Sequence, residues 1–162
     1  MKRKKEKEIG NRDIEFLEGE FINVKQSTVR SVEGGHVELQ QVGALSIDGE
    51  RIEVTQGASG ILKGNDIHLN QSISLITAAD NVSVNYSLSP VTVSREQTSA
   101  NKSAVGIMAA REIKSENTSA FLVLSNKIEG NITTLLDWKS ALALGGVLGG
   151  LWGFFSLLAR RK

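Results

Sequence analysis

Apolar residues recur along most of the chain with a period of 15 residues. When the sequence is aligned in blocks that begin at residues 21, 36, 51, 66 and 81, the same block positions carry Ile, Val or Leu. A repeat of this length is too short for a pair of helices, and the alternation of apolar and polar residues is the period of a β-strand. The fourth block position, which we expect to form an inward column, holds Val24, Leu39, Val54, Leu69 and Val84.

Glycines close several blocks in the manner of turns, at positions 34, 49 and 64. Short strands, tight turns and a fixed period predict an all-β fold, a single-stranded β-solenoid (β-helix) with about 15–16 residues per coil. One coil cannot bury its own apolar face, so stacking of the coils must stabilise the fold. We expect the solenoid to occupy residues 21–135, after a basic N-terminal tail and cap at residues 1–20.

Four Asn-x-Ser triplets continue the repeat into the second half of the chain. They begin at residues 70, 85, 101 and 117, which predicts coils of 15, 16 and 16 residues. Because the repeat accounts for these triplets, we do not expect them to be glycosylated. The pattern fades over residues 94–100, which predicts a loop or a bulge. The same spacing predicts a partial corner column of Ser27, Ser72, Ser87, Ser103 and Ser119.

The sixth block position carries glutamine in four successive blocks. Amide side chains that are stacked at the spacing of β-strands can hydrogen-bond to one another as a ladder. We expect such a solenoid ladder at Gln26, Gln41, Gln56 and Gln71.

The C-terminal segment has the features of a membrane anchor. Residues 140–159 contain no charge, and 20 helical residues span roughly 30 Å, the thickness of the hydrocarbon core of a bilayer. The sequence therefore predicts one C-terminal transmembrane α-helix within residues 136–162. Small residues spaced by four allow close helix packing in lipid, so we expect helix association through Gly145, Gly146, Gly149, Gly150 and Gly153.

Basic residues are concentrated at the two ends of the chain, although the net charge is only +1. The body between them is acidic, which argues against nucleic-acid binding. No apolar stretch follows the basic N-terminus, so we expect a single-pass membrane protein with a cytoplasmic solenoid. The positive-inside rule favours the opposite orientation, with the C-terminal end in the cytoplasm. The basic residues expected to face lipid are Lys2, Arg3, Lys4, Lys5, Arg160, Arg161 and Lys162.

The sequence offers little material for catalysis. There are no cysteines, and His36 and His68 occupy different block positions. No phosphate-binding loop and no nucleophile–base–acid set is present. We therefore expect no enzymatic activity, no catalytic residues, no metal, no cofactor and no small-molecule substrate.

The segment KIEGNITT at residues 127–134 resembles the bactofilins, which are bacterial polymer-forming proteins with a β-helical core. Their coils often carry a Val/Ile-x-Gly-x-Ile pattern, matched here by Ile128, Gly130 and Ile132. The resemblance covers only the solenoid and implies a β-helix that self-polymerises. The coils of 15–16 residues, the glutamine column and the glycine-rich C-terminal helix depart from that family.

These features favour a non-enzymatic, membrane-anchored scaffold or adaptor that tethers or organises a protein complex at the membrane. The expected partners are membrane lipid and protein subunits, either copies of this chain or others, bound through the transmembrane helix and a solenoid face. A bactofilin-like, self-polymerising cytoskeletal protein is the alternative. A glycine-zipper oligomeric membrane pore is a more remote one.

Overall fold

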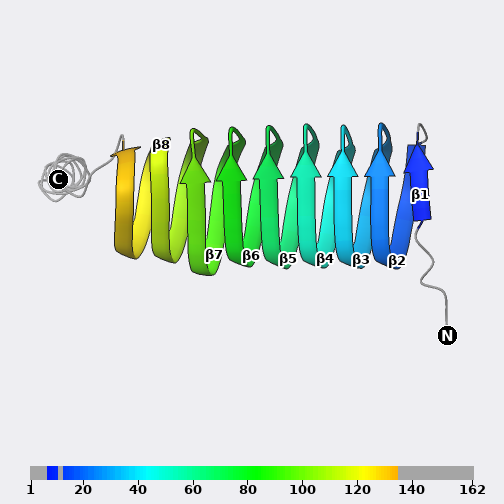
Figure 1. Cartoon of the computed structure of the whole chain (residues 1–162), viewed down its shortest axis with the longest axis horizontal. Coiled ribbons are helices and arrows are strands. Elements are labelled where there is room, and N and C mark those ends of the chain that lie inside the picture. Colours follow the sequence, from blue (N-terminus) through cyan, green and yellow to red (C-terminus); the bar gives the residue numbers. More distant parts are fainter. Residues whose placement is uncertain (1–6, 11–12, 135–162) are drawn as a thin grey trace, which may run out of the picture.

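The computed structural model describes residues 7–10 and 13–134, and all of its regular structure is β. The strands form one parallel sheet in which each strand pairs with the next in sequence. Almost every residue of a coil belongs to a strand, so the chain winds as a solenoid into a rod (Figure 1). The predicted all-β solenoid is therefore confirmed. Its strands are β1 (Lys7–Gly10), β2 (Asp13–Lys25), β3 (Thr28–Gln40), β4 (Gly43–Thr55), β5 (Ala58–Asn70), β6 (Ile73–Asn85), β7 (Leu88–Asn101) and β8 (Ala104–Thr134).

Coil stacking begins before residue 21. Strand β1 already pairs with β2, and β2 pairs with β3 from Asp13 onwards, both in the 15-residue register. The apolar period is hard to see in this segment because Phe16 is exposed, whereas Leu17 points inward and is buried.

One coil contains an extra residue. Between β6 and β7, Ala79 pairs with Ser94 but Asn81 pairs with Gln97, which places a β-bulge near the residue range where the repeat fades. Strand β7 continues through this bulge instead of opening into a loop.

The period returns to 15 residues after the bulge. Asn101 pairs with Glu116, so the expected second 16-residue interval is wrong. Asn117 therefore lies one position beyond the Asn column. The amide of Ser119 donates to the carbonyl of Ser103, as the first amide of each earlier strand does, so Ser119 stacks outside the serine column. The hydrogen-bond ladder, and not the similarity of the triplets, sets the register.

The core of the early coils is aliphatic. The predicted inward column is buried, with Val24, Leu39 and Val54 all at most 1% exposed. The column continues through Leu69 and Val84, and these residues belong to one cluster that extends from Leu17 to Val84. A separate apolar cluster lies in the last coils, around Met108 and Ile113.

Hydroxyl groups fill the core between these two clusters. Ser74, Thr77, Ser89 and Thr92 are completely buried. Thr77 Oγ1 donates to Ser74 Oγ at 3.0 Å, and Thr92 Oγ1 donates to Ser89 Oγ at 2.8 Å. A buried hydroxyl group is costly unless it is hydrogen-bonded. These hydrogen bonds therefore allow β6 and β7 to have a polar interior.

No helix occurs among residues 7–10 and 13–134, and so none there could cross a membrane. The predicted anchor at 136–162, its five glycines and the basic residues at both ends of the chain lie outside the described residues.

Candidate functional site

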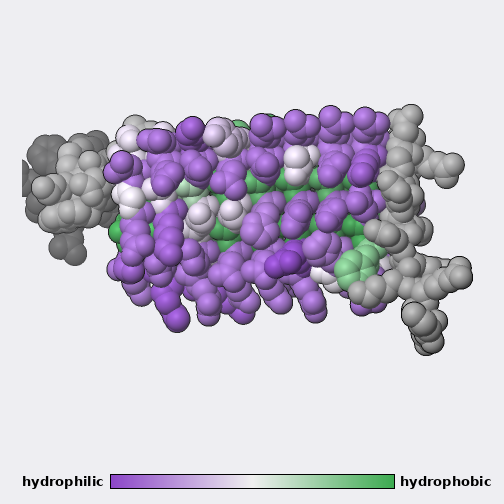
Figure 2. Space-filling view, viewed as in Figure 1, coloured by the Kyte–Doolittle hydropathy of each residue, from purple (hydrophilic) through white to green (hydrophobic). Residues whose placement is uncertain are grey.

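The outward residues of the coils form three surfaces that run along the rod. The polar face is made by the last five residues of β3–β7 and by residues 112–116 of β8. Figure 2, which looks onto the strand ends drawn as arrows in Figure 1, shows hydrophilic residues over most of this side. Side-chain hydrogen bonds connect neighbouring coils on this face. For example, Asn81 Nδ2 donates to Asp66 Oδ1 at 3.0 Å.

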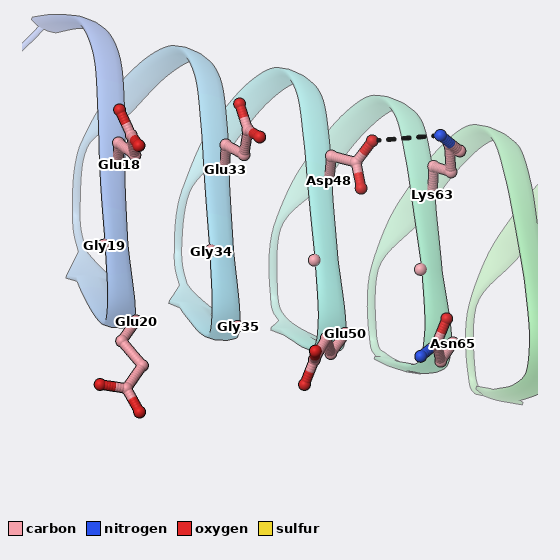
Figure 3. A pocket seen from close by; sticks show the side chains of 12 residues that line it. Glu18, Gly19, Glu20, Glu33, Gly34, Gly35, Asp48, Glu50, Lys63 and Asn65 are labelled. Atoms are coloured by element: carbon pink, nitrogen blue, oxygen red, sulfur yellow. Dashed lines mark hydrogen bonds and ion pairs between the residues drawn. The ribbon is translucent and has the colours of Figure 1, made fainter.

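The second surface is a glycine groove on the early coils. Its floor is formed by Gly19, Gly34, Gly49 and Gly64, and the open groove has a volume of about 570 Å³. Figure 3 shows acidic side chains along both sides of this floor. They are Glu18, Glu33 and Asp48 on one side and Glu20 and Glu50 on the other.

The glycine groove is lined mainly by glycine and acidic residues and lacks the features of a small-molecule site. Its acidic row ends at Lys63, whose Nζ lies 3.4 Å from Asp48 Oδ2. Both side chains are mostly solvent-exposed, so the pair adds little stability. Ligand pockets of similar volume are enclosed and mostly apolar, which this open acidic groove is not. Among the described residues, no group of three or more His, Cys, Asp or Glu side chains could hold a metal ion.

The third surface, the apolar face, consists of the first, third and fourth residues of the segments 43–46, 58–61, 73–76, 88–91, 104–107 and 119–122. None of these positions is charged, and only Ser46 and Ser119 are polar. The preceding coil differs, because Arg30 occupies the corresponding third position and pairs with Glu15. The largest exposed side chains of the face are Leu45, Ile61, Ile73, Leu75, Ile76, Leu88, Ile107 and Phe121.

The apolar face reverses the usual distribution of polarity. In β6, Ile73, Leu75 and Ile76 are 48%, 56% and 44% exposed, whereas Ser74 and Thr77 between and beside them are completely buried. Large exposed apolar patches on soluble domains mark binding surfaces, and buried polar groups are the other informative exception. Here both occur in the same coils, so packing within the described solenoid does not explain the pattern.

The corner that follows each strand carries one residue in the left-handed conformation. Gln26, Gln41, Gln56 and Gln71 have φ between 49° and 55°. Their side chains are exposed and hydrogen-bonded from coil to coil, each Nε2 donating to the next Oε1 at 3.1, 3.3 and 3.1 Å. The row continues with residue 86, a tyrosine in the same conformation.

The next residue supports the same corner from inside. Ser72 Oγ donates to the carbonyl of Asn70 at 2.8 Å and accepts from the amide of Gly57 at 3.2 Å. Ser87 and Ser103 accept in the same way from the coil before them. A buried hydroxyl therefore takes the place of a backbone carbonyl at these corners, which satisfies an amide that would otherwise have no partner.

One ion pair near the end of the described chain perturbs titration. The hydrogen bond from Lys127 and its positive charge lower the pKa of Glu129. The same hydrogen bond, with the charges of Glu112 and Glu129, raises the pKa of Lys127. These side chains are exposed, so we assign the pair no catalytic role.

The two histidines do not come together. His36 Nε2 lies 3.3 Å from Glu38 Oε1 and the ring packs beside Phe21, whereas His68 is exposed on a later coil. The acidic residues of the early coils are divided between two surfaces, with Glu33 and Asp48 in the glycine groove and Glu38 and Glu53 on the polar face.

The apolar face was missed by the sequence analysis. Its signal is present in the repeat, because the runs at residues 73–76 and 88–91 place serine at the second position between apolar neighbours. Alternation alone does not tell which of the two sets points inward.

Comparison with known proteins gives no identification. No family model matches the chain, and neither the curated proteins nor the solved structures contain a match.

Proposed function

We propose that this chain is a non-enzymatic scaffold whose solenoid organises a protein complex, held at a membrane by residues 136–162. The observation that carries the proposal is the uncharged apolar face, which extends over six consecutive coils. A stack of strands is stiff, and a rigid surface loses little conformational entropy on binding. The acidic groove and the polar face add further surfaces on the same rod.

The mass of the native particle tests this proposal. The full chain is solubilised gently and its mass is measured by light scattering on a size-exclusion column. A discrete particle that contains other polypeptides in fixed ratio supports the scaffold. A particle of fixed size that holds this chain alone contradicts it.

Variants of single exposed residues connect the result to the apolar face. Leu75→Glu places a charge on the apolar face at a side chain that is 56% exposed, so the fold tolerates it. We expect this variant to lose the polypeptides bound at this face, whether they are copies of this chain or others, and so to give a particle of lower mass. His68→Glu, at an exposed position of the polar face, is the matched control and should retain them.

A bactofilin-like polymer is the second candidate, and the last coil favours it. Residues 119–134 have no further coil stacked on them among the described residues, and Ile128 at this end is 51% exposed. An open strand edge can pair with the edge of another copy. A heterogeneous, high-mass distribution that contains only this chain, seen as filaments by electron microscopy, would support polymerisation and exclude the scaffold.

A further inference from the structure

The middle row of the apolar face consists of projecting side chains interrupted by two notches. The third residues of the six segments are, in order along the rod, Leu45, Gly60, Leu75, Pro90, Gly106 and Phe121. No side chain projects at the two glycines. A Cβ on Gly60 would lie 2.5 Å from the carbonyl oxygen of Leu45, and one on Gly106 would collide with that of Pro90. The notches are therefore fixed features of the face.

The area of the face matches the requirement of a stable protein interface. From their exposed fractions, its eight large side chains present on the order of 800 Å², which is about what each partner contributes to an interface of standard size. Interface cores are depleted of charged residues, as this face is. A partner for it must be equally apolar and similar in length.

We propose that the occupant of the apolar face is the same face of a second copy, with the two rods antiparallel and a two-fold axis through Pro90. This inference rests on the scaffold function proposed above and names its first partner. An axis that lies in the interface, at right angles to the rods and over Pro90, reverses the order of the coils and sets each row of one copy against the same row of the other. Leu75 of one copy then faces the notch at Gly106 of the other, and Phe121 faces the notch at Gly60. Each contact occurs twice, as an isologous interface requires.

The side rows of the face follow the same two-fold axis. Ile73 of one copy lies against Ala104 of the other, so that a large side chain again meets a small one. In the other side row Ile76 lies against Ile107, so the contact there is apolar. This arrangement resembles the packing of two β-sheets face to face.

A parallel pair fits less well. A two-fold axis along the rods would place each middle-row residue against its own copy. Leu75 would then meet Leu75, and Gly60 would meet Gly60, which stacks projections on projections and leaves empty space at the notches. Unfilled space loses dispersion contacts on both sides, so the antiparallel pair is favoured.

The antiparallel arrangement has a consequence for the scaffold. It places the Thr134 residues of the two copies at opposite ends of the pair. If the proposed anchors at residues 136–162 of both copies enter one bilayer, the rods must lie along the membrane surface. Both polar faces and both glycine grooves stay exposed and can bind other subunits.

Disulfide cross-linking of the full chain tests the proposal, because the natural sequence has no cysteine. The test variant carries Ile73→Cys and Ala104→Cys. Within one chain these residues lie on β6 and β8 with β7 between them, at least about 9.6 Å apart. That separation exceeds the roughly 7 Å limit for a disulfide. We therefore expect a covalent dimer after mild oxidation. Adding Leu75→Glu should lower the yield of dimer by about tenfold or more, since it places a charge in the interface.

Two matched variants complete the test. Ile73→Cys with Ile76→Cys reports the parallel pair, and a dimer from this variant instead overturns the antiparallel arrangement. His68→Cys with Lys114→Cys lies on the polar face, and a dimer of equal yield there shows random collision and overturns the proposal. Failure of both apolar-face variants to dimerise overturns self-association altogether.

A photoreactive residue at position 75 separates this failure from failure of the scaffold. A cross-link to a different polypeptide overturns the second copy as occupant but leaves the scaffold standing. A cross-link within the chain to residues 136–162, or a product that contains only lipid, would show that the face does not bind another protein. Either result contradicts the role of the apolar face in both proposals.

Discussion

Gly49 lies so close to the carbonyl oxygen of Gly34 that a Cβ at Gly49 would approach that oxygen to 2.6 Å. Gly34 stands in the same relation to Gly19. Neither Gly34 nor Gly49 has a positive φ, so tight stacking of coils and not turn geometry requires glycine here.

Gly49→Ala should lower the free energy of unfolding by about 1–3 kcal/mol, the usual cost of overpacking. Chemical denaturation followed by circular dichroism measures it. Gly43→Ala is the matched control, because its Cβ would lie an ordinary 3.9 Å from Thr28 Cγ2. Equal destabilisation by the two alanines would show that the close approach to Gly34 is not the cause.

The glutamine ladder and the left-handed corner can be separated at Gln41. Gln41→Gly removes two side-chain hydrogen bonds but relieves the strain of its φ of 55°, whereas Gln41→Ala removes the bonds and keeps the strain. We expect the glycine variant to be more stable than the alanine variant by about 1 kcal/mol. Thermal unfolding of both variants measures the difference. An alanine variant at least as stable as the glycine variant would show that the corner is unstrained.

The buried hydroxyl network should behave cooperatively. Thr77→Val keeps the shape of the side chain but removes the hydrogen bond to Ser74, and should cost about 1–2 kcal/mol of stability. Replacing Ser74 by alanine in the same chain removes the partner that is left, so the double variant should recover part of this loss. Denaturation curves of the single and double variants test this expectation. Strictly additive losses would contradict a coupled network.

The Lys127–Glu129 pair predicts a weak pH dependence at the end of the solenoid. The pKa of Glu129 is lowered, so its contribution is present above the unfolded pKa and is lost as pH falls through the folded one. The pKa of Lys127 is raised, so its contribution is present below the unfolded pKa and is lost as pH rises through the folded one. The pair therefore stabilises the fold at pH values that lie between the pKa of Glu129 and the pKa of Lys127.

NMR titration of the Glu129 carboxyl group measures this coupling. Lys127→Met should move the pKa of Glu129 upwards, toward its ordinary value, since Lys127 supplies the main causes of the shift. Lys102→Met, on an earlier coil, should leave the titration unchanged. An unchanged pKa in the Lys127 variant would show that the contact is not maintained in solution.

The solenoid and its inward columns could be predicted because both depend on local regularity. A 15-residue period in residues such as Val24 and Leu39 survives only if each coil stacks on the last in the same register. The bulge near Ser94 could be anticipated for the same reason, as an interruption of that period.

The position of Ser119 could not be obtained in this way. A triplet that resembles the earlier ones suggested one register, and the backbone hydrogen bonds of β8 adopt another. Sequence similarity is a weak guide to strand register, because a shift of one residue moves every side chain of the strand to the opposite surface.

The sequence by itself determined the strands, the coil length and the aliphatic interior of the early coils, because alternation and period are written in neighbouring residues. The tertiary structure alone decided that Ser74 and Thr77 point inward while Ile73, Leu75 and Ile76 point outward. Hydropathy would place the apolar residues of this run inside. Pairing with the coils on both sides fixes the opposite phase, because backbone hydrogen bonds and the corner geometry are continuous along the rod. The apolar face therefore arises from stacking.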